Sequence, residues 1–340
     1  MGCWRRKRRR NGRGADRLWR RELRLAHLPD VLAHWDIPPV TSIAAVHAGH
    51  RVFKITTIGP TFILKDISDA PDLSRLEFTR SVLAHVARTG LRVPIPLLSR
   101  SAQTAVPFQE RFYLLSHFIE AGGCPSDPKL QAELFYHTGQ AIAKLHQALA
   151  SYPDKQVNRK TWREDIAGRV DEWISALGDG LPEPQATVVK RVSLERGTAL
   201  KAALYGLPEQ LIHRDCHPGN ILVQGTHVIG FVDCDHLCIG PRFFDLAYYA
   251  VHHLKWVTDN EAATDRWLTN LPHLLAGYRS QQRLSQEEAM AIPYGMTAYH
   301  LLLSHWFMGL PQRESIAREI RALDWIHTHF DAIASATMSS

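Results

Sequence analysis

Residues 211–223 read LIHRDCHPGNILV, and the polar stretch HRDCHPGN at 213–220 is the most informative part of the chain. Asp215 follows His213 after one residue, and Asn220 comes five positions after Asp215. The Pro-Gly pair between them favours a tight turn. Apolar residues flank the stretch on both sides, so we expect two short strands joined by a polar loop. The spacing alone leaves two interpretations open, a catalytic loop and a surface turn.

Residues elsewhere in the chain favour the catalytic interpretation. Phosphoryl transfer from a nucleotide needs a group that orients the acceptor hydroxyl, oxygen ligands for Mg²⁺ and a cation for the phosphates. Asp215 can orient the hydroxyl. Asn220 and Asp233, which lies thirteen residues further on in GFVDCD, can bind the metal. Lys65, at the end of the predicted strand FILKD, can bind phosphate if Glu77 on the next predicted helix holds it.

Together, LIHRDCHPGNILV and the later GFVDCDHLCIGPRFFDLAYY (230–249) resemble the aminoglycoside phosphotransferase and choline kinase-like family. The resemblance runs from about Ala45 to Tyr249 and includes GQAIAKLH (139–146). RVFKITTIGPTFILKD (51–66) is similar in particular to the spore-coat kinase-like and homoserine kinase-like branches. The family implies an α+β protein-kinase-like fold with two lobes, a small antiparallel β lobe with one helix and a larger, mostly helical lobe.

The resemblance implies a role for each polar residue around the loop. Asp215 would be the catalytic residue, and Asn220 and Asp233 would be the magnesium ligands. His213 and Asp245, the latter in FFDLA, would be buried supports of the catalytic loop.

ATP would be held by residues that come earlier in the chain. Lys65 would bind its phosphates, with Glu77 as the partner of that lysine. Residues 116–120, SHFIE, would form the hinge, with backbone groups near His117 and Ile119 meeting the adenine. HAGHR (47–51) occupies the place of the phosphate-covering loop with one glycine, Gly49, and a phosphate contact and a plain hairpin turn both stay open there.

Two departures bear on the acceptor. Arg214 stands where the small-molecule enzymes often have Gly and protein kinases have Arg. Only twelve residues separate Asp233 from Asp245, which is too short for the activation segment of a protein kinase with its Ala-Pro-Glu element. This spacing favours an acceptor other than a typical protein substrate.

The 340 residues suit two lobes rather than one core. We expect a basic, disordered tail over 1–24, a nucleotide-binding lobe over 25–120, a catalytic and acceptor lobe over 121–333 and a flexible tail over 334–340. The first lobe is rich in predicted strands, and helices dominate the second. Residues 161–177 are expected to form one continuous helix.

The formal charge of +6 is misleading, because residues 1–24 alone carry eleven Lys or Arg and two acids. The rest of the chain is therefore mildly acidic, and any nucleic-acid contact would come from this tail. Five scattered Cys predict reduced thiols and a cytoplasmic protein rather than a disulfide framework. No apolar run is long enough to span a membrane.

We therefore expect an ATP- and Mg²⁺-dependent phosphotransferase that acts on the hydroxyl of a small molecule, an alcohol, sugar or amino alcohol. The alternatives are an atypical Ser/Thr kinase acting on a protein or peptide, and a catalytically silent structural protein with a kinase fold. YYAVHHLKW (248–256) and YGMTAYHLLLSHW (294–306) could line an acceptor site or belong to the core. A polycationic acceptor would call for clustered carboxylates, and the acids of this region are scattered.

Overall fold

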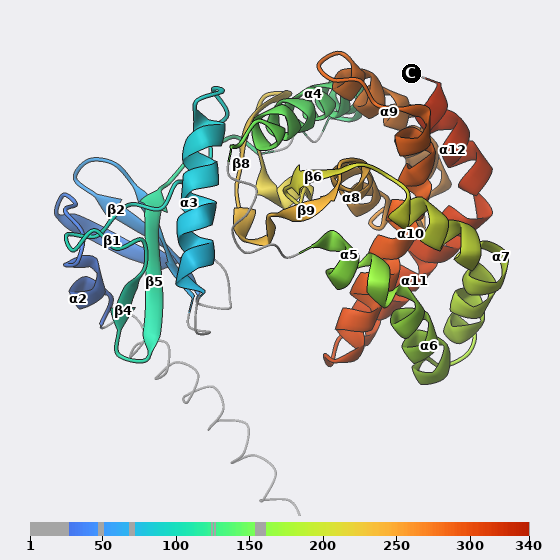
Figure 1. Cartoon of the computed structure of the whole chain (residues 1–340), viewed down its shortest axis with the longest axis horizontal. Helices are drawn as coiled ribbons and strands as arrows, with labels where there is room; N and C mark the ends of the chain where they lie inside the picture. Colours follow the sequence, from blue (N-terminus) through green and yellow to red (C-terminus); the bar gives the residue numbers. More distant parts are fainter. Residues whose placement is uncertain are drawn as a thin grey trace, which may run out of the picture. The chain divides into compact units, whose positions relative to one another are not determined.

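The computed structural model describes residues 27–46, 51–67, 72–123, 125, 127–153 and 161–339. The chain divides into two compact units (Figure 1). Unit 1 comprises Met1–Ala84 and Pro94–Glu120, and unit 2 comprises His85–Val93 and Ala121–Ser340. The predicted tail over 1–24 and Gly49 lie outside the described residues.

Unit 1 is built on a five-stranded antiparallel sheet with the strand order β1-β2-β3-β5-β4. The strands are β1 (Val40–Ala45), β2 (Val52–Thr57), β3 (Phe62–Asp66), β4 (Val106–Phe108) and β5 (Arg111–His117). Burial alternates along β3, where Phe62, Leu64 and Asp66 are buried while Lys65 is half-buried. Because successive side chains of a strand point to opposite faces, Lys65 lies on the face opposite the core.

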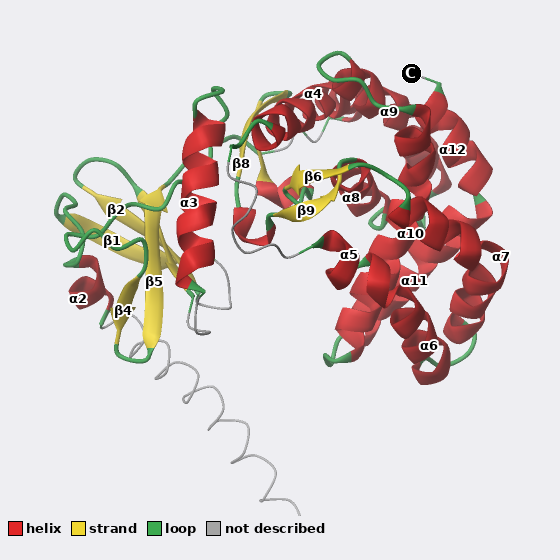
Figure 2. Cartoon of the chain, viewed as in Figure 1, coloured by secondary structure: helices red, strands yellow, loops and turns green. Residues whose placement is uncertain are grey.

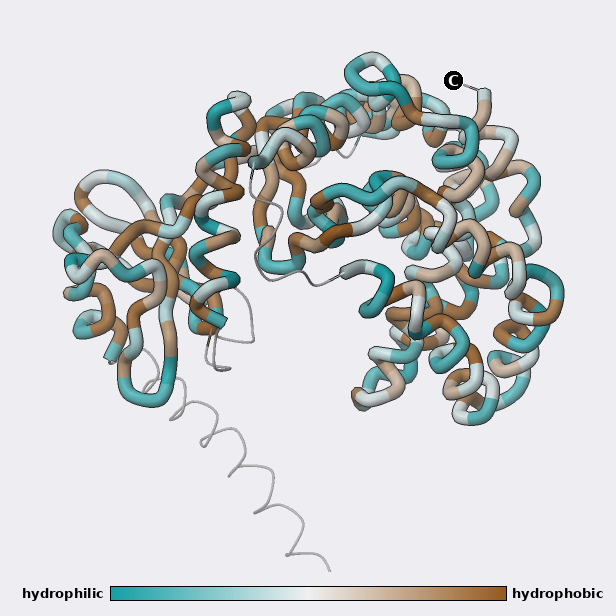
Figure 3. The backbone as a smooth tube through the Cα atoms, viewed as in Figure 1, coloured by the Kyte–Doolittle hydropathy of each residue, from teal (hydrophilic) through white to brown (hydrophobic). Residues whose placement is uncertain are grey.

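The core of unit 1 lies between this sheet and the short helix α2 (Leu28–Leu32). Leu28, Val31 and Trp35 pack against Ile55 and Leu64 of the central strands. The strands contribute the hydrophobic stretches that are brown in Figure 3. The longer helix α3 (Leu73–Ala87) follows β3 and carries Glu77, which is exposed.

Unit 2 is mostly helical (Figure 2). Its α-helices are α4 (Gln131–Ala150), α5 (Trp162–Asp165), α6 (Val170–Gly180), α7 (Gln185–Tyr205), α8 (Phe243–Leu254), α9 (Glu261–Arg279), α10 (Gln286–Met308), α11 (Arg313–Thr328) and α12 (Phe330–Met338). Its single-turn 3₁₀ helices are η1 (Pro128–Leu130), η2 (Ala167–Arg169), η3 (Pro218–Asn220) and η4 (Cys234–His236).

Helices α4 and α9 pack unusually closely, and two glycines allow it. A Cβ at Gly277 would lie 1.9 Å from the carbonyl oxygen of Tyr136, and one at Gly139 would lie 2.0 Å from that of Leu274. No side chain fits at either position, so the two backbones approach directly. This packing brings His146 of α4 against Tyr278 of α9.

Two small antiparallel sheets carry the polar loop quoted above. β6 (Glu209–Ile212) pairs with β9 (Cys238–Pro241), and β7 (Ile221–Gln224) pairs with β8 (His227–Phe231). HRDCHPGN therefore connects the end of β6 to the start of β7, as expected from its flanks. The segment after β8 returns through η4 to β9, so that both polar stretches emerge from neighbouring strand ends.

Three elements differ from the expectations. Residues 161–177 form α5, η2 and α6 rather than one helix, because Ile166 has φ −125° and ψ −68°, outside the helical region. Helix α7 occupies residues 185–205, for which no helix is predicted above. Residues 334–338 continue α12 instead of forming a tail, and the backbone oxygen of Thr337 accepts a hydrogen bond from Arg279. Among the described residues, none of the helices is both long and apolar enough to cross a membrane.

Candidate active site

Asp215 and Asn220 contact each other across the loop. The amide nitrogen Nδ2 of Asn220 donates to the Asp215 carboxylate (2.8 Å) and to the Asp215 backbone oxygen (3.0 Å). Asn220 is buried, whereas the Asp215 side chain keeps 17% of its surface exposed. The loop thus presents one fixed and partly accessible carboxylate.

Asp233 joins this pair through the backbone. The N–H of Val232 donates to the carbonyl oxygen of Asn220 over 2.8 Å, which places the following residue, Asp233, beside the loop. Asp233 has φ 58° and ψ 50°, a left-handed conformation that costs a non-glycine residue about 1–2 kcal/mol. Strained backbone of this kind concentrates at functional sites.

The set of oxygen donors fits a magnesium ion. Because Nδ2 of Asn220 faces Asp215, its Oδ1 points elsewhere, and no hydrogen bond between described residues uses this oxygen. Asp233 adds a carboxylate to this oxygen, because it directly follows Val232, whose N–H is bonded to the Asn220 backbone. Mg²⁺ is commonly held by one or two such ligands together with substrate phosphates and water. Among the described residues no group of three or more His, Cys, Asp or Glu could hold a metal without such help.

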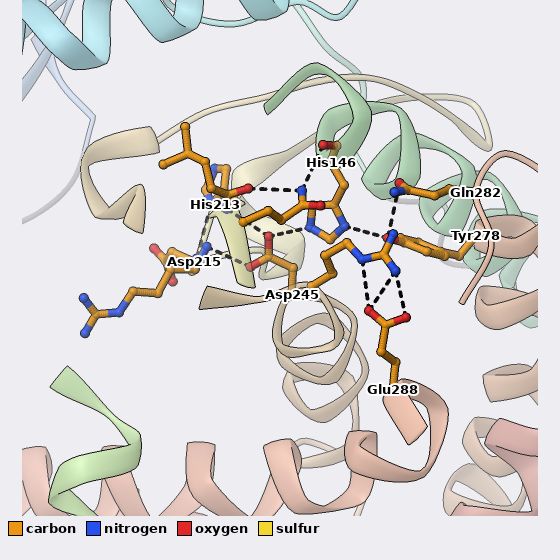
Figure 4. A network of polar contacts seen from close by, with 11 residues as sticks. His146, His213, Asp215, Asp245, Tyr278, Gln282 and Glu288 are labelled. Carbon is orange, nitrogen blue, oxygen red and sulfur yellow. Dashed lines mark hydrogen bonds and ion pairs between the residues drawn. The ribbon is translucent and has the colours of Figure 1, made fainter. Parts of the chain in front are cut away.

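Behind the loop lies a fully buried polar network centred on Asp245 (Figure 4). Its carboxylate accepts from the backbone N–H of His213 (2.9 Å), from that of Arg214 (2.7 Å) and from Nε2 of His146 (3.0 Å). The other ring nitrogen of His146 lies 2.9 Å from the Tyr278 hydroxyl. Burial raises the pKa of Asp245, but the bonds from His146 and His213 outweigh it, so that the pKa is below its ordinary value.

The tautomer of His213 follows from its partners. The backbone N–H of Asp215 can only donate, so Nδ1 of His213, at 3.2 Å, must accept. The carbonyl oxygen of Val232, at 3.1 Å from Nε2, can only accept, so Nε2 carries the proton. A neutral His213 therefore links the backbone of Asp215 to the residue before Asp233. His213 and Asp245 are both buried and bonded to the loop, and their expected role as its supports stays a prediction.

Arg214 shows why glycine suits this position. It has φ 71°, in the left-handed region that glycine enters at least cost. The backbone N–H of Arg214 donates to Asp245, which stabilises the turn. The Arg214 guanidinium pairs with Asp165 of α5 over 2.7 Å. Arg214 therefore points toward α5, and in this chain it ties that helix to the HRDCHPGN loop.

His217 belongs to the same site. Its Nδ1 accepts from the N–H of Gly219 (3.0 Å), and its Nε2 lies 3.8 Å from a carboxylate oxygen of Asp215. Burial lowers the pKa of His217, and this effect is larger than the opposing effect of Asp215. The side chain is therefore mainly neutral at neutral pH and orders the turn.

The predicted nucleotide residues lie in unit 1. Lys65 is on β3, Glu77 on α3 and His117 at the end of β5, with the His117 ring 4.9 Å from that of Phe62. Ile119 is half-buried. The roles expected of these residues, and of Gly49, stay predictions.

Sequence reasoning missed one residue of this network. His146 lies in the quoted stretch GQAIAKLH without a predicted role, and its ring holds Asp245. Tyr248, His252 and Lys255 belong to YYAVHHLKW, for which an acceptor site and the core both stayed open, and they follow Asp245 at intervals of three, four and three residues. In a helix this spacing places all of them on one face. The periodicity counted from Asp245 was the available signal.

Comparison with known proteins identifies relatives of this arrangement. The model of the phosphotransferase enzyme family matches residues 41–290. A homoserine kinase of Rhizobium meliloti is 26% identical over 271 residues, which cover 77% of this chain and 77% of that protein. One from Beijerinckia indica is 27% identical over 278 residues, 78% of this chain and 79% of that protein.

Solved structures share the fold. A microcompartment-associated aminopropanol kinase aligns with a TM-score of 0.69 at 20% identity, covering 91% of this chain and 98% of the other. An amicoumacin kinase in complex with AMP-PNP, Ca²⁺ and its ligand aligns with a TM-score of 0.68 at 18% identity, covering 89% and 94%. These similarities confirm the predicted α+β protein-kinase-like fold.

Proposed function

Because the chain belongs to the phosphotransferase enzyme family, we propose that it uses ATP and Mg²⁺ to phosphorylate the hydroxyl of a small amino alcohol or hydroxy amino acid. The expected enzyme class, a kinase with an alcohol group as acceptor, is confirmed by this membership and by the homoserine kinase relatives. The observation that carries the proposal is the pairing of Asp215 with Asn220 in a loop anchored by Asp245.

Asp215 is suited to act on the acceptor. Its carboxylate is held by Asn220, is partly accessible and can accept a hydrogen bond from an incoming hydroxyl. The hydroxyl oxygen then attacks the γ-phosphorus, and the bond from that phosphorus to the β–γ bridging oxygen breaks as ADP leaves. The hydroxyl proton passes to Asp215 and from there to solvent. Fixing the carboxylate in advance avoids the cost of ordering it during the reaction.

Asn220 and Asp233 would hold the magnesium ion, which when bound supplies positive charge next to the transferred group. The oxygen Oδ1 of Asn220 supports this role, since hydrogen bonds between described residues leave it unused. Lys65 and Glu77 would serve the phosphates from unit 1, and the backbone near His117 and Ile119 would bind adenine.

The acceptor class rests on two arguments. Between Asp233 and Asp245 the chain forms only η4 and β9, and β9 is paired with β6, so this segment offers no long loop for a peptide substrate. The relatives are named for homoserine and aminopropanol, both small molecules with a hydroxyl and an amine. A peptide acceptor and a silent structural protein are the alternatives.

The test is a coupled assay of the full chain with Mg²⁺, with either ATP or GTP, and a panel of acceptors. The panel holds L-homoserine, 3-aminopropan-1-ol, kanamycin and a Ser-containing peptide, with product identified by mass. We expect phosphorylation of at least one of the two amino alcohols. Phosphorylation of the peptide alone, or of nothing, would contradict the proposal.

A variant pair tests the residue assignment. Asp215→Asn should lower kcat by roughly 10²–10⁴-fold, the usual effect of losing a catalytic base. The control is Asp265→Asn, an exposed carboxylate on α9, which should stay within about twofold of the original chain. If Asp215→Asn keeps more than a tenth of the activity, the assignment of Asp215 is wrong.

A further inference from the structure

A second polar cluster lies beside the catalytic loop and has no role in the chemistry described above. It is formed by side chains from α8, α10 and α11, which pack together in unit 2. Its members are Tyr248, His252, Lys255, Tyr299, His300 and Glu319. We call this set the acceptor cluster.

The acceptor cluster is continuous with Asp215. The ring of His217, whose Nε2 lies 3.8 Å from the Asp215 carboxylate, stacks on His252 with ring centres 4.9 Å apart. Nδ1 of His252 lies 3.5 Å from the Tyr299 hydroxyl. The ring of Tyr299 meets that of Tyr248 edge to face at 4.4 Å. Burial, Tyr299 and Asp215 together raise the pKa of Tyr248, so its hydroxyl stays protonated beside the catalytic carboxylate.

A buried ion pair stands at the far end of the cluster. Nζ of Lys255 lies 3.5 Å from a carboxylate oxygen of Glu319, and the two side chains expose 8% and 2% of their surface. The other oxygen of Glu319 lies 2.8 Å from Nδ1 of His300, which is fully buried. Burial raises the pKa of Glu319, but His300 and Lys255 outweigh it, so this carboxyl group is ionised at neutral pH.

Lys255 is poorly satisfied for a buried ammonium. It donates to the Tyr299 hydroxyl over 3.3 Å and faces Glu319 at 3.5 Å, whereas charge-assisted bonds are normally about 2.7–2.9 Å long. An ammonium has three N–H groups, and the described residues supply acceptors for two. Its remaining contacts are the rings of Tyr299 and Trp256, at 5.6 Å and 5.9 Å.

Stability alone does not account for a buried ion pair, which suggests another reason for its presence. Removing two charges from water costs several kcal/mol for each ion, and packed apolar residues are often as stable. His252 cannot share the positive charge, because burial and the neighbouring Lys255 lower its pKa to about 2. Lys255 is therefore the cation that the described part of the cluster offers to an anionic group.

We propose that Lys255, positioned by Glu319 and Tyr299, binds the carboxylate of an acceptor that carries a hydroxyl for Asp215, so that the enzyme selects hydroxy amino acids over amino alcohols without a carboxylate. The inference rests on the proposed function and narrows its acceptor. The carboxylate accepts the third N–H of Lys255, and the contacts through Tyr299, His252 and His217 connect this point to Asp215.

The test compares two acceptors that differ only in the carboxylate, L-homoserine and 3-aminopropan-1-ol. With the full chain, kcat/KM should favour L-homoserine by roughly 10–100-fold, the effect of one charge-assisted hydrogen bond. Lys255→Met keeps the apolar stem and removes the charge. It should raise KM for L-homoserine about tenfold or more and change KM for 3-aminopropan-1-ol by less than about threefold.

Three further variants complete the design. Tyr299→Phe removes a hydroxyl that positions Lys255 and should raise KM for L-homoserine alone by roughly 3–10-fold. This variant still tests the role of Lys255 if Lys255→Met does not fold. Lys255→Arg should restore most of the preference. Lys201→Met, at an exposed lysine paired with Asp171, is the control and should change neither KM.

The outcomes separate the inference from the proposed function. If the original chain phosphorylates neither compound, the proposed function fails. If it phosphorylates both equally well, or if Lys255→Met and Tyr299→Phe affect both acceptors alike, the proposed function stands and Lys255 does not select the carboxylate.

Discussion

Replacing Asp245 with Asn tests the claim that one buried carboxylate holds the catalytic loop. The Asp245 side chain accepts three hydrogen bonds, two at Oδ2 from His213 N and His146 Nε2 and one at Oδ1 from Arg214 N. Asn has a single oxygen and a donating NH₂ group. In its best orientation the oxygen keeps the two bonds at Oδ2, and the NH₂ group then faces the N–H of Arg214.

The magnitude follows from these contacts. One charge-assisted bond is lost, at about 1.5–3 kcal/mol, and a buried donor is left unsatisfied. The two remaining bonds weaken by roughly 1 kcal/mol each because their acceptor is neutral. The variant does not bury a charge, and the avoided desolvation cost offsets part of the lost stability. We expect a net loss of about 2–4 kcal/mol in the free energy of unfolding.

Urea unfolding followed by fluorescence measures this loss, and steady-state kinetics measure its effect on the loop. Since Arg214 loses the bond that stabilises its left-handed backbone, Asp215 shifts and kcat should fall by about tenfold or more. Asp259→Asn, which removes an exposed partner of Arg321, is the matched control and should cost less than about 0.5 kcal/mol. A loss below 0.5 kcal/mol for Asp245→Asn would refute the reasoning.

Further predictions concern backbone geometry, packing and pH. Arg214→Ala should be about 1 kcal/mol less stable than Arg214→Gly in urea unfolding, because both lose the pair with Asp165 but only glycine relieves the strain of φ 71°; equal stabilities would contradict this. Gly277→Ala should cost about 2 kcal/mol or more, since a Cβ there meets the Tyr136 backbone oxygen, whereas Gly197→Ala in α7, with no atom nearer than 3.7 Å, should stabilise by up to about 1 kcal/mol. Because the pKa of Asp245 is lowered in the folded state, its contribution to stability is fully present above about pH 4 and is lost as pH falls through the lower, folded value. The free energy of unfolding, measured between pH 6 and pH 2, should therefore decrease more steeply with falling pH for the original chain than for Asp245→Asn.

Much of the candidate site could be predicted from the sequence because its parts are local. Asp215 and Asn220 lie five positions apart in a loop between two short strands, and the contact between their side chains depends on little more than that turn. The expected roles of His213 and Asp245 come from family resemblance, and two hydrogen bonds are consistent with them. The Asp245 carboxylate accepts from the backbone N–H of His213, and Nδ1 of His213 accepts from the backbone N–H of Asp215.

Other features depend on contacts between residues far apart in the chain. His146 and Asp245 are separated by 99 positions, and they meet where α4 contacts α8. Gly139 and Gly277 let α4 and α9 approach, which brings Tyr278 to the other ring nitrogen of His146. Helix α7 carries a weak apolar pattern, so its burial against α6 and α11 could not be predicted from periodicity. The break at Ile166 falls at a buried residue that is neither Pro nor Gly, so the residue type at that position did not predict it.

The family and the fold class could be inferred from the sequence alone, because short spacings and strand-flanking patterns do not depend on packing, and the catalytic role of HRDCHPGN stays a proposal made from the same patterns. Only the tertiary structure brought Lys255, Tyr299 and Glu319 together from three helices. Tyr299 and Glu319 lie 44 and 64 positions after Lys255, and no local sequence rule pairs residues so far apart. Glu319 becomes a buried partner of Lys255 only when the helices pack. The acceptor cluster is therefore a property of the fold, whereas HRDCHPGN can be recognised in the sequence alone.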